Sequence, residues 1–179
     1  TQEDWRLRRA GCGAFWGPDH PYNFSTPLDG PGQSNNRAEI SAVLQVLRQD
    51  KRPLHIRPDS EITESGLRTL LAGGGWNALG DHADLWQQVA GELQERETGD
   101  VRIRKVYSHL TWQQAQAIGM TKEDWWGNRA ADSLADKGAD AHQDVSKLAE
   151  RMKLRRKMMV KLQQYRVRVH LWQNDRCRE

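Results

Sequence analysis

At 179 residues the chain is long enough for one globular domain and an appendage. Its 37% hydrophobic and 28% charged residues are ordinary for a soluble protein, and no apolar run reaches about 18 residues, so no membrane-spanning helix and no membrane partner are expected. The two cysteines, Cys12 and Cys177, match no metal-binding spacing and favour a reducing, intracellular location in the cytoplasm or nucleus.

The net charge of +3 combines two segments of opposite sign. From residue 147 onward, eleven Lys and Arg residues stand against three acidic residues, a net charge of +8, whereas the rest of the chain carries −5. A basic segment of this kind is attracted to phosphate, although a solvated linker helix is an equally valid interpretation. We therefore expect a globular domain over residues 1–143 and a basic amphipathic helical tail over residues 144–179.

The first half of the chain predicts a β-hairpin, a helix and a strand. Residues 9–16 and 22–28 are the hairpin strands, joined by a turn that contains two prolines. A helix begins near Asn35, and its apolar residues recur at helical spacing. A brief strand over residues 53–58 then ends at Asp59.

The second half predicts two helices, a strand and a closing helix. The first two helices cover residues 60–71, with Ser60 as the cap, and residues 84–96. An alternating strand over residues 101–107 leads to His109, and a helix over residues 128–137 ends before a glycine. The order of elements predicts an α/β architecture in which a mixed sheet is flanked by helices.

Three acidic residues fall at the ends of these elements. Glu39 lies one turn inside the first helix, Asp59 follows a strand, and Asp132 lies near the start of the last helix. Because strand ends and helix starts converge on one edge of an α/β layer, the three carboxylates can share a pocket. Their hard oxygen atoms suit Mg²⁺ or Mn²⁺. The alternative is that each is an exposed or capping acid.

Four segments occur in the order found in one enzyme family. They are residues 33–39 (QSNNRAE), residues 59–60 (DS), residues 106–109 (VYSH) and residues 127–135 (GNRAADSLA). Together they resemble type I ribonucleases H. The segment at residues 8–11 and the Leu-Trp pair at 85–86 are most similar to ribonuclease H domains attached to retroelement reverse transcriptases.

This resemblance implies a metal-dependent nuclease site. Glu39, Asp59 and Asp132 would be metal ligands for two Mg²⁺ or Mn²⁺ ions, and clustered carboxylates repel one another until a cation binds. His109 would lie near the cleaved phosphate and assist proton transfer or product release, for which its near-neutral pKa is suitable. The alternative for His109 is an ordinary surface histidine at a strand end.

The resemblance also implies a substrate surface at the start of the first helix. Asn35 and Asn36 would lie in the minor groove of an RNA–DNA hybrid, where amides can meet base edges and 2′-hydroxyl groups. Ser34 would add a phosphate contact through its hydroxyl or backbone N–H. The alternative is that Asn35 or Asn36 simply caps the helix.

One departure from the family pattern concerns its first strand. The family has a fourth acidic ligand in an Asp-Gly-Ser/Thr segment, which is missing from this sequence. We expect the domain over residues 1–143 to be N-terminally truncated, with that aspartate upstream of Thr1. Asp4 is the only nearby substitute, and it lacks the glycine and serine that accompany the family aspartate.

Three functions are compatible with the sequence. The first is an endonuclease that hydrolyses the RNA strand of RNA–DNA hybrids by a two-metal-ion mechanism, within a retroelement polyprotein that also contains a reverse transcriptase domain. The second is a catalytically inactive module of the same fold that binds a hybrid or duplex. The third is a nuclease of the integrase or resolvase type, against which residues 34–39 (SNNRAE) argue.

The basic tail leaves further alternatives open. Its apolar residues recur at an approximate heptad spacing that Arg155 and Arg166 interrupt. The tail can therefore pack on the domain, form a dimer or bind a nucleic-acid backbone.

Overall fold

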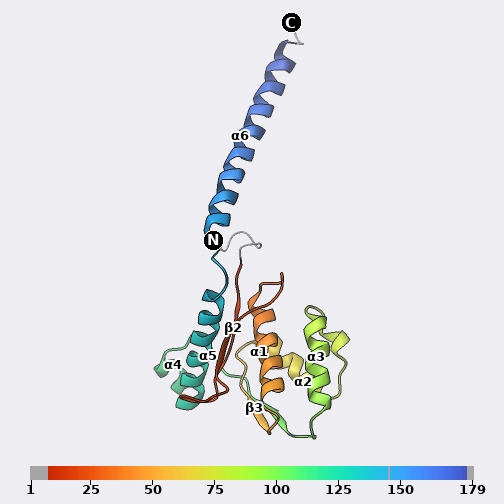
Figure 1. Ribbon diagram of the computed structural model, residues 1–179, viewed down its shortest axis with the longest axis vertical. Coiled ribbons are helices and arrows are strands. Elements are labelled where there is room, and N and C mark those ends of the chain that lie inside the picture. Colours follow the sequence, from red (N-terminus) through yellow and green to blue (C-terminus); the bar gives the residue numbers. More distant parts are fainter. Residues whose placement is uncertain (1–7, 145, 177–179) are drawn as a thin grey trace. The chain divides into compact units, whose positions relative to one another are not determined.

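The computed structural model describes residues 8–144 and 146–176 (Figure 1). These residues divide into two units, Arg8–His142 and a C-terminal unit that begins at Gln143. The expectations about Asp4 and Cys177 concern residues that lie outside the described part of the chain.

A short β-hairpin and a long helix form one side of the first unit. Strands β1 (Gly11–Ala14) and β2 (Phe24–Pro27) pair antiparallel, and α5 (Lys122–Asp140) contacts both. A Cβ atom at Gly11 would clash with the α5 backbone at Ala135, so glycine permits this close approach. Helix α5 therefore lies directly against the hairpin (Figure 1).

Helix α1 (Asn35–Gln49) contributes buried residues to two of the three hydrophobic clusters found among the described residues of the unit. Its N-cap is Ser34, whose hydroxyl accepts a hydrogen bond from the Arg37 backbone N–H at 3.2 Å. The alternative interpretation, that Asn35 or Asn36 simply caps this helix, is therefore wrong. Ala38 and Ala42 pack towards β1, whereas the larger buried residues of α1 pack towards the second strand pair.

The second strand pair and two helices enclose the larger cluster. Strands β3 (Leu54–Ile56) and β4 (Val101–Ile103) pair parallel, and α2 (Glu61–Leu71) and α3 (Ala83–Gln94) pack beside α1. A short 3₁₀ turn, η2 (Trp76–Leu79), connects them. Trp86 is 1% exposed, and its indole lies where a Cβ atom on Gly66 would be. Ser60 caps α2, as predicted.

The strands are shorter and the closing helix longer than predicted. Helix α5 starts at Lys122, six residues before the expected start at residue 128, because Thr121 caps it there. Gly138 does not end the helix; it lies inside α5, where a Cβ atom would clash with the backbone of Thr26. A six-residue helix, α4 (Trp112–Ala117), precedes α5 and begins with a capping box at Thr111.

The predicted α/β class with strands of both orientations is confirmed. One strand pair is antiparallel and the other parallel, and helices flank both. Within the described residues the two strand pairs are not hydrogen-bonded into one continuous sheet. Helix α1 links them, because it contributes to the hydrophobic cluster beside each pair.

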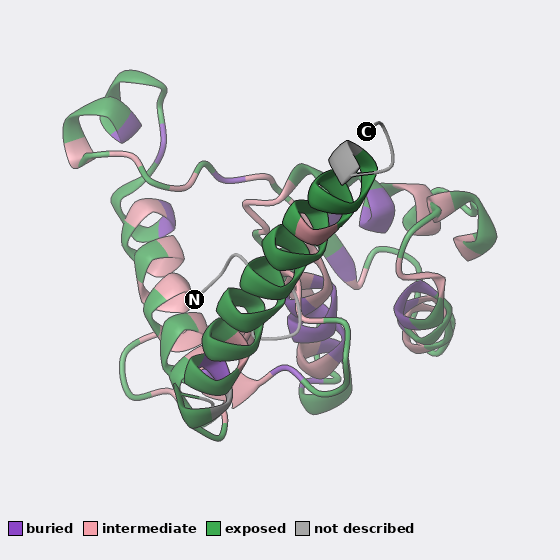
Figure 2. Ribbon diagram, turned by 90° about the horizontal axis from the view of Figure 1, so that it is seen from above, coloured by how far each residue is buried: buried purple, intermediate pink, exposed green. Residues whose placement is uncertain are grey.

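The C-terminal unit consists mainly of one helix, α6 (Ser146–Arg176). Most of its residues are exposed, as the green ribbon of Figure 2 shows. No helix among the described residues is long and apolar enough to cross a membrane. Helix α6 is the C-terminal helix that the sequence predicts.

Candidate functional site

The three predicted acidic residues come from three different elements of the first unit. Glu39 lies in the first turns of α1, Asp59 lies between β3 and α2, and Asp132 lies in the middle of α5. All three are half-buried. The charge of Asp59 raises the pKa of both Glu39 and Asp132, and the charge of Asp132 raises that of Glu39, so the fold brings residues 39, 59 and 132 into one electrostatic neighbourhood.

Glu39 is held by the first turn of α2. The Thr63 hydroxyl donates a hydrogen bond to Glu39 Oε2 at 3.2 Å, and Thr63 itself is 1% exposed. Burial raises the pKa of Glu39, and the negative charges of Asp59 and Asp132 raise it further. Hydrogen bonds from Ser60 and Thr63 act in the opposite direction. A half-buried carboxylate with like-charged neighbours is a group whose charge a cation would stabilise.

Asp132 has a similar environment on the α5 side. Its pKa is raised first by burial and then by the charges of Asp59 and Asp136, whereas His109 and Arg129 lower it. Asn128, one turn earlier on α5, donates a hydrogen bond to Asp132 Oδ2 at 3.4 Å. The effect of His109 places the imidazole near this carboxylate, and its role at a cleaved phosphate stays a prediction.

His109 lies on the segment between β4 and α4. It is exposed, and its φ of 57° lies in the left-handed region, which is uncommon for a residue other than glycine. The neighbouring residue is fixed to α5, because the Trp125 indole N–H donates to the Leu110 carbonyl at 2.8 Å. Arg129 lies over the Trp125 ring at 5.2 Å from its centroid. The loop that carries His109 is therefore anchored next to the helix that carries Asp132.

The expected substrate residues lie at the N-terminal end of α1. Asn35 is exposed and Asn36 half-buried, and they precede Glu39 by four and three residues, so they share its helix face. The Ser34 hydroxyl already accepts a hydrogen bond as the N-cap, although it can still donate one. The three residues therefore lie at the same end of α1 as Glu39, and their contact with a substrate stays a prediction.

A buried ion pair that sequence analysis missed connects two of these elements. Asp124 is 3% exposed, and its carboxylate pairs with Arg57 and, at 3.6 Å, with Arg104. Arg57 lies two residues before Asp59, and Asp124 lies about two turns before Asp132 on α5. The ion pair therefore ties the Asp59 segment to the helix of Asp132. Its partners are 67 residues apart in sequence, and no local pattern signals such a contact.

The donor chemistry of the site suits a divalent cation. Glu39, Asp59 and Asp132 offer hard carboxylate oxygens, and their mutual repulsion is what a bound cation would relieve. Among the described residues, however, no group of three or more His, Cys, Asp or Glu side chains is assembled as a metal-binding cluster. The coordination of two ions by these three residues therefore stays a prediction.

Comparison with known proteins identifies the family. Residues 4–140 match the family model for RNase H, which covers more than half of the chain, so the chain belongs to the ribonuclease H family. It is 33% identical over 137 residues to ribonuclease H of Schizosaccharomyces pombe, with 73% of this chain and 46% of the relative covered. It is 32% identical over 143 residues to human ribonuclease H1, with 78% and 46% covered. The chain thus spans under half the length of these two relatives.

A solved structure supports the fold. The protease-reverse transcriptase of prototype foamy virus is similar with a TM-score of 0.52 at 19% identity, over 76% of this chain and 21% of that chain. At this identity the likeness concerns the fold alone. The predicted family and fold class are therefore confirmed.

Proposed function

We propose that this chain is a hybrid ribonuclease, an endonuclease that hydrolyses the RNA strand of RNA–DNA hybrids with two Mg²⁺ or Mn²⁺ ions. The observation that carries the proposal is the shared electrostatic neighbourhood of Glu39, Asp59 and Asp132 within a ribonuclease H fold. The names of the curated relatives, ribonuclease H and ribonuclease H1, support the same reaction.

The site residues would have two roles. Three carboxylates would bind the metal ions, and neighbouring residues position these carboxylates. Divalent ions, when bound, activate a water molecule and stabilise the leaving 3′-oxygen of an in-line displacement. Glu39, Asp59 and Asp132 would supply the carboxylate oxygens that hold them. Thr63 keeps Glu39 oriented through its hydrogen bond. The Asp124 ion pair, described above, keeps the Asp59 segment close to α5.

His109 and the asparagines would act on the substrate directly. The His109 imidazole lies near Asp132 and is exposed, so it can reach the scissile phosphate and transfer a proton to or from it. Asn35 and Asn36 can donate to and accept from a ribose 2′-hydroxyl, the group that separates RNA from DNA. The Ser34 hydroxyl can donate to a phosphate oxygen. The products would carry 5′-phosphate and 3′-hydroxyl ends.

The direct test is cleavage of a labelled RNA–DNA hybrid in the presence of Mg²⁺ by a polypeptide that also contains the expected upstream aspartate. We expect Asp59→Asn to lower the rate by more than about a hundredfold, because a metal ligand contributes several kcal/mol to transition-state stabilisation. Duplex DNA of the same sequence should remain uncut. Normal hybrid cleavage by the Asp59→Asn protein would rule out the proposed role of this site.

A second candidate is a module that binds hybrids or duplexes without cleaving them. It is favoured by the absence of an assembled cluster of three metal-binding side chains in the part of the chain that the structure describes. Tight hybrid binding without detectable cleavage over a titration of Mg²⁺ and Mn²⁺ would select this candidate.

We further propose that the chain acts within a retroelement polyprotein that also contains a reverse transcriptase. Support comes from the resemblance at residues 8–11 and 85–86, and from the similar fold found in a viral protease-reverse transcriptase. Its substrate would then be a product of reverse transcription, in the cytoplasm or the nucleus. Mass spectrometry of the native polypeptide would test the proposal, which predicts peptides of a reverse transcriptase in the same chain.

A further inference from the structure

Helix α6 carries a large excess of positive charge. Between Ser146 and Arg176 there are ten Lys and Arg residues and only two acidic residues, Glu150 and Asp175. Within the described residues, no ion pair joins a cation between Lys147 and Arg168 to a carboxylate. These charges are therefore available to a partner of opposite sign.

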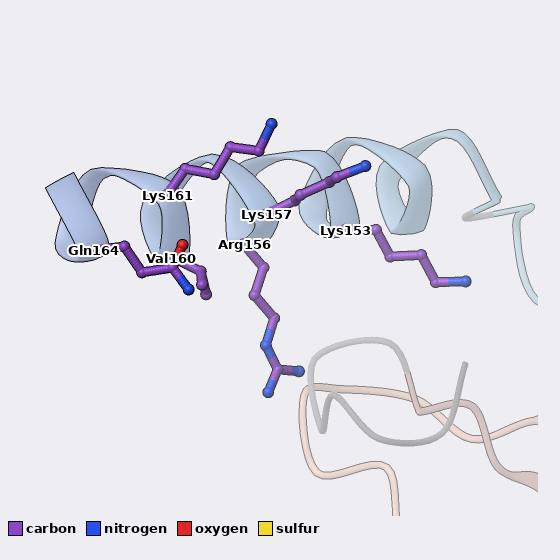
Figure 3. A pocket seen from close by; sticks show the side chains of 6 residues that line it. All are labelled: Lys153, Arg156, Lys157, Val160, Lys161 and Gln164. Atoms are coloured by element: carbon purple, nitrogen blue, oxygen red, sulfur yellow. The ribbon is translucent and has the colours of Figure 1, made fainter.

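Four of the cations gather around a shallow hollow on α6. The hollow is lined by Lys153, Arg156, Lys157, Val160, Lys161 and Gln164 (Figure 3). Lys153, Lys157 and Lys161 succeed one another at intervals of four residues, so they form one row along the helix, and Arg156 lies beside it. Figure 3 shows all four side chains extending away from the helix. The lining contains no acidic side chain to neutralise them.

The distribution of residues on α6 disfavours two other occupants. A second copy of α6 would bring two helices of the same strong positive charge together, and like charges at close range repel. A membrane surface requires the apolar residues to occupy one face of the helix. Exposed apolar residues of α6 instead occur around the helix, since Met158, Met159 and Val160 are consecutive and 46–55% exposed.

A nucleic-acid backbone fits both the charge and the shape. Duplex nucleic acid carries about one negative charge per 1.7 Å of its axis. A helix of 31 residues is about 46 Å long, which can follow the phosphates of a duplex over about 14 base pairs. The cations surround much of the helix, so several orientations place some of them against phosphate.

We propose that α6 is a nucleic-acid-binding arm that contacts the phosphate backbone without reading its sequence. Lys153, Arg156, Lys157 and Lys161 form the centre of this contact. The proposal rests on the proposed function only in taking an RNA–DNA hybrid as the nucleic acid, and it does not require catalysis.

The test is the salt dependence of hybrid binding, measured by fluorescence anisotropy in EDTA so that no cleavage occurs. The variant replaces all four residues by glutamine (Lys153→Gln, Arg156→Gln, Lys157→Gln and Lys161→Gln), which retains a good helix former. We expect the dissociation constant at about 50 mM salt to rise tenfold or more. The slope of log K against log salt should become shallower by up to about 3.6, because each of the four lost phosphate contacts removes about 0.9.

A charge-conserving variant is the matched control. It exchanges lysine and arginine at the same four positions, and it should bind with the slope of the unchanged chain. Far-ultraviolet circular dichroism of both variants shows whether α6 stays helical. Equal affinity and equal slope for the glutamine variant and the unchanged chain would overturn the proposal.

Two further measurements decide between occupants. If the glutamine variant loses affinity only for phosphatidylserine vesicles, or dissociates from a dimer in sedimentation while binding the hybrid normally, the proposal is wrong. A chain that binds the hybrid through α6 in EDTA but does not cleave it in Mg²⁺ contradicts the proposed nuclease function and leaves this inference standing.

Discussion

The two units of the chain use their charged residues in opposite ways. In Arg8–His142, cations are paired with carboxylates across the fold, as Arg57 is with Asp124 and Arg37 with Asp84. On α6 the described cations have no such pairing. In the first unit these ion pairs hold helices and strands together, whereas the unpaired cations among the described residues of α6 remain available to bind a partner. Each of the following experiments tests one side of this contrast.

The carboxylates of the candidate site are an exception within the first unit, because they repel rather than pair. For Glu39→Gln we expect hybrid cleavage to fall by more than about a hundredfold. Thermal stability should be unchanged or rise by a few degrees, since the change removes a buried charge next to Asp59 and Asp132. Cleavage kinetics and a thermal melt measure the two effects. Glu95→Gln, at a largely exposed acid, is the control and should alter neither.

The ion pair between Asp124 and Arg57 positions the Asp59 segment relative to α5. Asp124→Asn leaves Arg57 and Arg104 without their buried partner, and we expect the free energy of unfolding to fall by about 2 kcal/mol, since both arginines are partly exposed and screened. Urea denaturation measures the loss. Hybrid cleavage should also fall, because α5 and the Asp59 segment are no longer tied together.

A double-mutant cycle separates this pairing from a general effect of Asp124. Arg57→Gln should destabilise less than Asp124→Asn, because it leaves Asp124 paired with Arg104. The two changes together should cost less than the sum of the single changes. Strict additivity would show that the two side chains do not interact.

The ion pair of Asp50 with Arg52 in the first unit should make the free energy of unfolding depend on pH. Arg52 hydrogen bonds to it at 2.9 and 2.7 Å and, together with the Trp16 indole, lowers the pKa of Asp50 from 3.8 to about 2. A carboxyl group whose pKa is lowered by folding stabilises the folded state above its unfolded pKa. That stability disappears as the pH falls from 3.8 towards 2.

Asp50→Asn should therefore remove stability at neutral pH and flatten the acid limb of the stability profile. The Arg52 side chain is 64% exposed, so we expect a loss of about 1 kcal/mol after solvent screening. Urea denaturation at a series of pH values measures it. A variant with the acid limb of the unchanged chain would show that Asp50 does not carry this dependence.

Features that depend on contacts between neighbours in sequence could be predicted from local patterns, whereas features that depend on distant contacts could not. Ser60 was identified as a helix cap, because a cap is a contact between close neighbours. The grouping of Glu39, Asp59 and Asp132 was predictable from family-like segments, which carry long-range information that spacing alone lacks. The candidate site could thus be predicted from the resemblance to a family, and not from the positions of its acidic residues alone.

The errors came from contacts that no local pattern encodes. Gly138 was expected to end a helix, since glycine often does so, but its missing side chain instead lets α5 pack on Thr26. The roles of Thr63 and Asp124 could not be predicted from the sequence, because each contacts a residue from a distant part of the chain. Their roles depend on tertiary packing, which decides where a polar side chain finds its partner.

The smallest expected effect concerns the stability of the first unit when the charges of α6 are removed. The four-glutamine variant of α6 should change the free energy of unfolding by less than about 0.5 kcal/mol, because exposed cations without ion pairs contribute little to folding. Urea denaturation followed by tryptophan fluorescence reports mainly on the first unit, which contains six of the eight tryptophans. A larger loss would mean that these cations do stabilise the fold, and the contrast between the two units would then disappear. An unchanged stability together with weakened hybrid binding would instead show that the positive charge of α6 serves binding alone.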